Sequence, residues 1–482
     1  MYTMNNIIIK KWFVFSFLII LVSGMQSCTK QLEKTPVDQV DGQSVFSSVQ
    51  TLEQGVLGVY ADWQEEYIMQ LGSVPTDECR IGLKNAGVNS SAQSLFRWTF
   101  SLGDKEIASP WATAYQIIGR ANSILGHIGT VPVKNVSEET KRNQLKGELL
   151  AIRAFQHFDL YRAYAYAPVY TPDAAAVPYI TRTDLDSKPS RPATADFFKL
   201  LKQDISDAET LLAQQTSSTN IRMGLNALQS LEARVALYAG DWQGAIDKSS
   251  LLINKIPLAT PNVFPAIWQD QSDAEVIFKL KRTNRSAFRP GDVWKNVATG
   301  IVYFAPALKL MRLYDSANDV RYSSYFATDS SLIAGGQLPN TINKYAGQPG
   351  ALNLADVKVF RTAEMYLIRA EAYARMGRLA DGTNDLNTLR AARIQGYTSQ
   401  SFASNTDLIR AILTERYKEL AFEGHRLFDL RRTNSNIERL ADDLPAGITK
   451  NLLQPSESVY HTPIPQAELL VNSNILPNNP GW

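Results

Sequence analysis

The sequence predicts a mostly α-helical protein in which pairs of helices form a scaffold and long irregular segments form the rest. Three observations lead to this prediction. Apolar residues recur at helical spacing from about residue 45 onward, two segments repeat one helix–turn–helix pattern, and three connecting stretches are unusually long. Of the 482 residues, 45 % belong to the class AVILMFWYC and 20 % are charged. This composition is that of a folded globular protein and excludes a disordered, collagen-like or multi-spanning membrane chain.

Two long helices are placed by the spacing of their apolar residues. The first is predicted to begin at Ser137 as its N-cap, before an acidic first turn, and to end near Ala167 because Pro168 cannot continue a helix. Its apolar positions are Leu145, Leu149, Ile152 and Phe155. The second helix is predicted to begin at Thr194 as its cap. Its apolar positions are Phe197, Leu201, Ile205, Ala208 and Leu212.

Two segments, from Ala233 through Gly240 and from Ala370 through Gly377, share one pattern: a helix of small residues, a glycine turn and a second helix. Small residues let paired helices approach closely and glycine ends the first helix, as in tetratricopeptide repeats. We therefore expect tetratricopeptide-like helix pairs around residues 137–167, 192–255 and 361–395. The alternative is two unrelated alanine-rich hairpins.

Three stretches of another character lie at residues 72–104, 170–191 and 283–304. They are rich in Gly, Pro, Asn and Ser with interspersed aromatic residues, and they far exceed the usual connection of about 4 to 6 residues. Loops of that length are usually functional or disordered. A short strand over Glu275–Leu280, with Val276, Phe278 and Leu280 on one side, is predicted to lead into the third loop.

The first residues have the pattern of a secretory signal peptide: Lys10 and Lys11 precede an apolar run over residues 12–22, too short to span a bilayer. Cys28 stands where the first mature residue of a bacterial lipoprotein would stand. We therefore expect a lipoprotein signal peptide over residues 1–27, lipidation of Cys28, a polar tether over 28–36 and a single body over 37–482. The alternative is ordinary cleavage without lipidation. With Cys28 lipidated, Cys79 has no disulfide partner and is expected to be a part-buried side chain.

Several classes of function lack their signature. The net charge of +2 provides no field that would attract nucleic acid, and the four histidines and two cysteines have no metal-ligand spacing, so neither metal nor cofactor is expected. Nucleotide-binding loops, the Gly-x-Ser-x-Gly elbow and the His-Glu-x-x-His motif are absent from the sequence. The adjacent carboxylates Glu65–Glu66 and Asp77–Glu78 do not form a glycosidase pair by adjacency alone, and solvated loop charges are the expected alternative.

Tryptophan is the more informative residue type. Trp98 and Trp294 fall in the long stretches, where exposed flat rings would suit the faces of sugars, whereas Trp111 and Trp242 fall in helical runs and are expected to pack in the core. His425, Asp429 and Arg432 are spaced to pair along one helix. No nucleophile accompanies them, so a structural ion-pair network is expected there rather than a catalytic His-Asp pair.

The chain resembles the SusD-like (RagB/SusD) outer-membrane lipoproteins of Bacteroidetes nutrient-uptake systems. The resemblance covers nearly the whole predicted mature chain, with Ser473 in place of the usual proline. The segments that carry it are Arg361–Ala372, Glu415–Arg432, Pro463–Trp482, Gly147–Arg162, Trp111–Asn122, and Asp319 with Arg321.

This resemblance implies a SusD-like α-α superhelix with a more irregular ligand-binding part, no catalysis, and a lipid-anchored position on the outer face of the outer membrane. It also implies that the protein captures nutrient oligomers and delivers them to a partner SusC-like TonB-dependent barrel. Because the family's ligand site is usually built from variable loops, no binding residue is carried over by motif. By position, the expected ligand-binding residues are Asp77, Arg80, Trp98, Phe288 and Trp294.

A glycan, as an oligosaccharide or polysaccharide, is the expected ligand. The alternatives are a peptide-capturing RagB-like lid, a surface glycoside hydrolase suggested by the aromatic-rich loops, and a tetratricopeptide scaffold that binds only protein.

Overall fold

The structure is a computed structural model that describes residues 44–85, 92–166, 169–184, 186–214 and 219–482. The predicted signal peptide over residues 1–27, the lipidation site Cys28 and the tether over 28–36 lie outside the described residues. Among the helices that the structure describes, none combines the length and the apolar character needed to cross a membrane.

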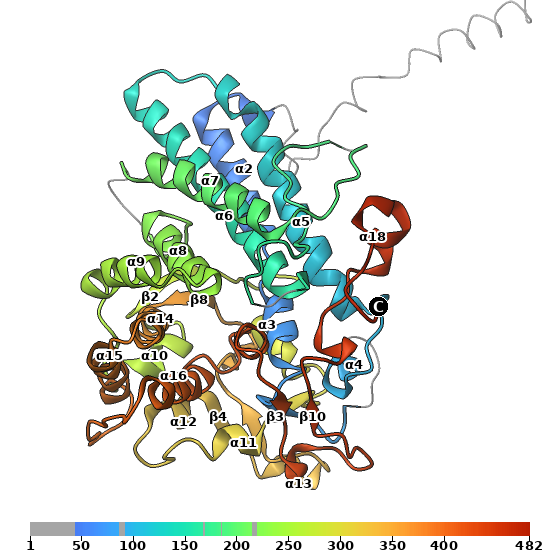
Figure 1. Ribbon diagram of the computed structural model, residues 1–482, viewed down its shortest axis with the longest axis vertical. Helices are drawn as coiled ribbons and strands as arrows, with labels where there is room; N and C mark the ends of the chain where they lie inside the picture. Colours follow the sequence, from blue (N-terminus) through green and yellow to red (C-terminus); the bar gives the residue numbers. More distant parts are fainter. Residues whose placement is uncertain (1–43, 86–91, 167–168, 185, 215–218) are drawn as a thin grey trace, which may run out of the picture.

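Four long helices pack together in one part of the molecule (Figure 1). They are α2 (Val49–Asp62), α5 (Lys105–His127), α6 (Val136–Tyr164) and α7 (Thr194–Leu212). The N-cap of α6 is Asn135 rather than Ser137, because the Asn135 side chain accepts a hydrogen bond from the backbone N–H of Glu138 at 3.0 Å. Thr194 is the first residue of α7 and not its cap, since its hydroxyl donates to the carbonyl oxygen of Ala174 at 2.9 Å.

A second group of helices stacks in sequence: α8 (Leu225–Ala239) on α9 (Trp242–Lys255), α9 on α14 (Thr362–Arg375), and α14 on α15 (Leu379–Ala391) and α16 (Asn405–Glu419) (Figure 1). Gly240 and Gly377 end α8 and follow α14 with φ angles of +70° and +79°, the left-handed conformation that favours glycine. The predicted tetratricopeptide-like helix pairs and the mostly α-helical fold are confirmed.

The remaining chain forms short elements at the other end of the molecule and along its side (Figure 1). The helices are α3 (Glu66–Ser73), α4 (Gln93–Arg97), α10 (Phe264–Trp268), α11 (Leu308–Met311), α12 (Val320–Tyr325), α13 (Ser331–Ala334), α17 (Arg426–Arg432) and α18 (Gln466–Val471). The strands form antiparallel pairs: β1 (Cys79–Ile81) with β3 (Phe304–Pro306), β2 (Val276–Leu280) with β8 (Val357–Arg361), β4 (Phe326–Thr328) with β5 (Asn340–Ile342), β6 (Gly347–Gln348) with β7 (Ala351–Leu352), and β9 (Ile437–Glu438) with β10 (Leu452–Leu453).

The strand predicted over 275–280 is therefore confirmed as β2, but all five of its residues are buried, so both faces pack against the protein. The stretch over 72–104 is not one loop. It begins inside α3 and contains β1 and α4.

A buried ionic cluster connects the helix stack to the irregular part. Glu419, the last residue of α16, is fully buried and lies within 3.1 Å of the guanidinium groups of Arg321, Arg361 and Arg393. Burial alone would raise the pKa of Glu419, but the three arginines outweigh this effect and hold the pKa well below its ordinary value. Glu275, the residue before β2, completes the cluster by pairing with Arg361 and Arg393 at 2.8 and 2.7 Å.

The ion-pair network predicted around α17 is also present. Asp429 accepts hydrogen bonds from Arg416 and Arg432 at 2.9 and 2.8 Å, and Arg432 binds both carboxylate oxygens of Glu371 on α14. Burial lowers the pKa of His425, assisted by the surrounding arginines, so the ring is neutral at ordinary pH. The ion pair predicted between Asp429 and Arg432 is therefore confirmed.

Candidate functional site

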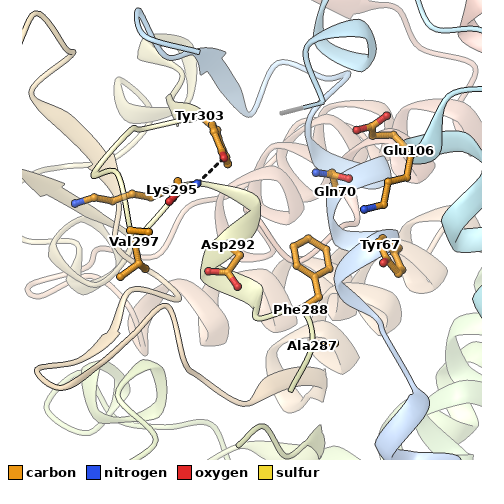
Figure 2. Close-up of a pocket in the computed structure, with 12 residues that line it drawn as sticks. Tyr67, Gln70, Glu106, Ala287, Phe288, Asp292, Lys295, Val297 and Tyr303 are labelled. Carbon is orange, nitrogen blue, oxygen red and sulfur yellow. Dashed lines mark hydrogen bonds between the residues drawn. The ribbon is translucent and has the colours of Figure 1, made fainter. Parts of the chain in front are cut away.

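The candidate site is a cavity of about 410 Å³ between α3, the start of α5 and the loop over residues 283–304. Its volume lies within the range of about 300 to 1,000 Å³ that is usual for small-ligand sites. Figure 2 shows Tyr67 and Gln70 on one side, Asp292 and Tyr303 on the other, and the Phe288 ring beside Tyr67. The cavity is lined by Tyr67, Gln70, Lys105, Glu106, Ala287, Phe288, Asp292, Lys295, Asn296, Val297, Ala298 and Tyr303.

The wall formed by α3 is fixed by a close backbone approach. A Cβ atom on Gly72 would lie 2.2 Å from the carbonyl oxygen of Gly424, and one on Gly424 would lie 2.7 Å from the Cα of Met69. Only residues without side chains can meet at this distance. The contact sets the position of α3 against the segment before α17, and hence the position of Tyr67 and Gln70.

The opposite wall is held by Asn353, which is buried and has a φ angle of +60°. Its side-chain amide donates to the carboxylate of Asp292 at 2.8 Å and to the carbonyl oxygen of Lys295 at 2.6 Å. The backbone N–H of Arg289 donates to the other carboxylate oxygen of Asp292 at 3.2 Å. Asp292 is therefore oriented by the fold before any ligand arrives.

Beyond Asp292 the chain forms a small hairpin, with an antiparallel bridge between Lys295 and Val302. The side-chain amide of Asn296 donates to the hydroxyl oxygen of Tyr303 at 2.9 Å across this hairpin, as the dashed line in Figure 2 marks. Val297 and Ala298 are exposed in its turn. The hairpin therefore presents an amide, a phenol and an ammonium group at one edge of the cavity.

Two aromatic rings supply the apolar part of the cavity. The rings of Tyr67 and Phe288 lie 5.2 Å apart, centroid to centroid, at 39° to each other, and both residues are half-buried. Carboxylates, amides, ammonium groups and a phenol surround them. An aromatic surface bordered by hydrogen-bonding groups of both kinds can bind the C–H face of a sugar and its hydroxyl groups together.

Of the predicted site residues, only Phe288 lines this cavity. The prediction that Trp98 and Trp294 present exposed rings is wrong. Trp98 is 6 % exposed, donates from Nε1 to the carbonyl oxygen of Pro75 at 2.7 Å, and packs on the guanidinium of Arg439. Trp294 is 2 % exposed and packs edge to face against Phe422. Both rings pack inside the protein and anchor their segments there.

Trp111 is buried, as expected, and Trp242 is half-buried against the core.

Asp77 and Arg80 also lie away from the cavity. Asp77 is buried, and although burial alone would raise its pKa, Arg426 and Lys309 lower the pKa to about 2. Arg80 lies on β1, paired with Ala305 of β3, and burial lowers its pKa. The Asp77 side chain is therefore part of the framework around α11 and α17.

The expectation of solvated carboxylates at Glu65–Glu66 and Asp77–Glu78 is wrong as well, because all four residues are buried. Glu66 is compensated by Arg282 at 2.6 Å, and Glu65 accepts a hydrogen bond from the indole of Trp63 at 2.9 Å. Cys79 is fully buried rather than part-buried, and burial raises the pKa of its thiol.

Glu78 gives a testable pH dependence. Burial raises the pKa of its carboxyl from 4.5 to about 8, so between these pH values the unfolded chain has lost a proton that the folded chain keeps, and stability falls as the pH rises. In Glu78→Gln this penalty is absent. We expect the variant to gain about 4 kcal/mol relative to the wild type between pH 5 and pH 8, at about 1.4 kcal/mol per pH unit.

Urea denaturation of both proteins at pH 5, 6.5 and 8 measures this difference directly. A difference that stays constant with pH would show that the Glu78 carboxyl ionises at its ordinary pH.

Most residues that line the cavity were not predicted as site residues, because of where they lie in the sequence. Tyr67 and Gln70 lie on a helix that precedes the predicted loop, and Glu106 lies in the first turn of α5. Asp292, Asn296 and Tyr303 do lie within the predicted 283–304 stretch. The sequence signal for this site was Phe288 followed at short range by Asp292 and Asn296. The larger tryptophans nearby were the more prominent candidates.

Within the described ranges, the acidic residues, histidines and cysteines form no group that could hold a metal ion.

Comparison with protein families gives two matches. A model described as "Starch-binding associating with outer membrane" matches residues 30–237, and a model described as "SusD family" matches residues 342–482. Together the two models account for most of the chain. A similar protein is the SusD-like protein P2 of Formosa agariphila, 24 % identical over 98 % of this chain and 100 % of the relative. The SusD-like protein P38 of the same organism is also 24 % identical, over 88 % of this chain and 92 % of the relative.

Solved structures show the same fold. A SusD superfamily protein from Bacteroides thetaiotaomicron superposes with a TM-score of 0.77 at 23 % identity, covering 90 % of this chain and 100 % of the other. A protein described as a putative sugar binding protein from Bacteroides vulgatus gives a TM-score of 0.76 at 23 % identity, covering 90 % of this chain and 99 % of the other. The fold contains the predicted helix stack, and two SusD family models match separate parts of the sequence. This chain therefore belongs to the SusD-like family.

Proposed function

We propose that this protein is a non-catalytic binding protein that captures a glycan in the cavity between α3 and the 283–304 loop. The observation that carries the proposal is the ring pair of Tyr67 and Phe288, surrounded by the oriented carboxylate of Asp292 and by amide and hydroxyl groups. The family model described as starch-binding and the sugar-binding description of one structural relative support a saccharide as the ligand.

The proposal extends to location and partner. Lipidation of Cys28 would place the protein on the outer membrane, at the cell surface, and the bound glycan would pass to a SusC-like TonB-dependent barrel. The description of the matching family model as associating with the outer membrane supports this location. A peptide in place of the glycan is the second candidate, because Lys105, Lys295, Glu106 and Asp292 line the cavity with charges of both signs.

Truncating Phe288 tests the site. Phe288→Ala removes one ring of the pair, and we expect it to weaken glycan binding by about 1 to 3 kcal/mol, the usual range for loss of an aromatic anchor. Affinity electrophoresis against a polysaccharide panel, followed by calorimetry on each polysaccharide that retards the wild type, measures the loss. Tyr166→Ala, which removes a ring that is 41 % exposed elsewhere on the surface, is the matched control and should bind as the wild type does.

Equal binding by the wild type and Phe288→Ala would place the glycan elsewhere. If no polysaccharide retards the wild type while a peptide library binds in a Phe288-dependent manner, the peptide candidate replaces the glycan. Release of reducing ends from the same panel would replace capture with hydrolysis.

A further inference from the structure

We propose that a second cavity, on another face of α5, is a separate saccharide-binding site. This goes beyond the function proposed above, which uses only the first cavity. The second cavity has a volume of about 370 Å³ and lies between α5, residues 178–184, Ser187, Pro189 and α18. In Figure 1, α18 stands beside α5 at the side of the molecule.

The floor of the cavity is apolar. The rings of Trp111 and Tyr115 lie 4.8 Å apart at 56°, and Pro178, Ile180 and Pro189 continue the surface. Trp111 is 4 % exposed and Tyr115 is half-buried, so the tyrosine contributes the more accessible ring. Such a floor offers a C–H face its apolar contact.

The loop that forms one wall is fixed by hydrogen bonds from the helices behind it. The Nε2 atom of His157 accepts from the backbone N–H of Ile180 at 2.9 Å, while Asn122 donates to the carbonyl oxygen of Ile180 at 3.0 Å and Arg153 to that of Thr181 at 2.9 Å. His157, Asn122 and Arg153 are all buried. The wall is therefore formed in advance, which lowers the entropic cost of binding.

The opposite wall comes from the C-terminal part of the chain. The backbone N–H of Gln466 donates to the carbonyl oxygen of Leu102 at 3.0 Å, and the side chain of Asn472 donates to that of Pro189 at 3.0 Å, so the start of α18 is tied to the segment before α5 and the residue after its end is tied to the loop that forms the other wall. Between these ties α18 carries Glu468 into the lining, where its carboxylate lies 3.4 Å from the indole nitrogen of Trp111.

The polar groups at the rim identify the class of ligand. Glu468 and Asp184 accept hydrogen bonds, Arg182 donates them, and Thr181 and Ser187 do both. The carboxylates of Glu468 and Asp184 would repel an anionic ligand, and the guanidinium of Arg182 would repel a cationic one. A neutral ligand that carries many hydroxyl groups and an apolar face satisfies donors, acceptors and floor together, and this is the chemistry of a saccharide.

The two cavities are distinct places on one helix. Glu106 lines the first, and Trp111 and Tyr115 line the second. Trp111 is five residues from Glu106, or about 8 Å along the axis at 1.5 Å per residue and about 140° around it. The two cavities share no lining residue, so a ligand can fill one while the other stays free.

The test uses the protein labelled with 5-fluorotryptophan and carrying Phe288→Ala, which weakens the first cavity. The fluorine resonance of Trp111, assigned with Trp111→Phe, is followed during titration with maltoheptaose, xylohexaose, laminarihexaose and, as a cationic probe, putrescine. We expect a saturable shift of this resonance with at least one oligosaccharide. Glu468→Gln, which keeps the shape of the side chain, should weaken that binding roughly tenfold through loss of a charged acceptor.

Unchanged resonances of the other tryptophans show that the variants remain folded. No shift of the Trp111 resonance with any oligosaccharide, or a shift with putrescine alone, would overturn the proposal. Binding at the first cavity is measured separately by the effect of Phe288→Ala in affinity electrophoresis, so failure of one site is distinguishable from failure of the other.

Discussion

Replacing Glu419 with alanine is expected to lower the free energy of unfolding by about 3 to 5 kcal/mol, the cost of removing one partner from a buried ion pair. The carboxylate accepts from Arg361 at 2.8 Å, from Arg321 at 3.0 Å and from Arg393 at 3.1 Å, and none of these groups has access to water. Its loss leaves the three guanidinium groups with too little negative charge around them. Urea denaturation at neutral pH measures the change.

Asp381→Ala is the matched control for this prediction. Asp381 pairs with Arg378 at 2.8 Å, but both side chains are nearly half exposed, so the pair is screened by water and its loss should cost less than about 1 kcal/mol. A similar small loss in Glu419→Ala would show that the other acidic residues of the cluster suffice.

Replacing Trp294 with alanine is expected to destabilise the protein by about 3 to 5 kcal/mol, the usual cost of deleting a large buried ring. The indole packs against Phe422 with ring centroids 5.4 Å apart, and the Trp294 carbonyl oxygen accepts from the backbone N–H of Tyr303 at 2.8 Å. The ring thus anchors the hairpin that lines the first cavity. Glycan binding should fall together with thermal stability.

Phe288→Ala separates the two effects, because it should weaken binding while changing stability far less. Trp294→Phe keeps an aromatic ring in the core, and it should retain more stability than Trp294→Ala. If Trp294→Ala kept the stability of the wild type and lost binding alone, the indole would be a ligand contact and not an anchor.

The sequence predicted the helical scaffold well because that scaffold depends on local signals. The apolar spacing that forms α6 and α7 repeats every three or four residues. The glycines at 240 and 377 likewise act on the helices directly before them. The buried carboxylates could not be predicted in this way. Glu66 is compensated by Arg282 and Asp77 by Arg426, and such partners lie hundreds of positions apart in the chain.

The candidate site was predicted only in outline for the same reason. The 283–304 stretch does line the cavity, through Phe288 and Asp292 among others. Which of its aromatic side chains face the cavity depends on which ones find packing partners in the core. Trp294 finds such a partner in Phe422 and is therefore buried. Ring size alone therefore predicted Trp294, which is buried, as a ligand contact ahead of Phe288, which lines the cavity.

The meeting of Gly72 and Gly424 also bears on how the first cavity can adapt to ligands of different shape. Because α3 is in backbone contact with Gly424, which follows the buried ion pairs of Glu419 along the chain, the Tyr67 wall cannot move without shifting the segment next to those ion pairs. The turn at Val297 and Ala298 is exposed and has no such constraint on its side chains. Changes of ligand specificity during evolution should accordingly concentrate in the turn at Val297 and Ala298, where substitutions destabilise the fold little. The α3 wall should stay the same.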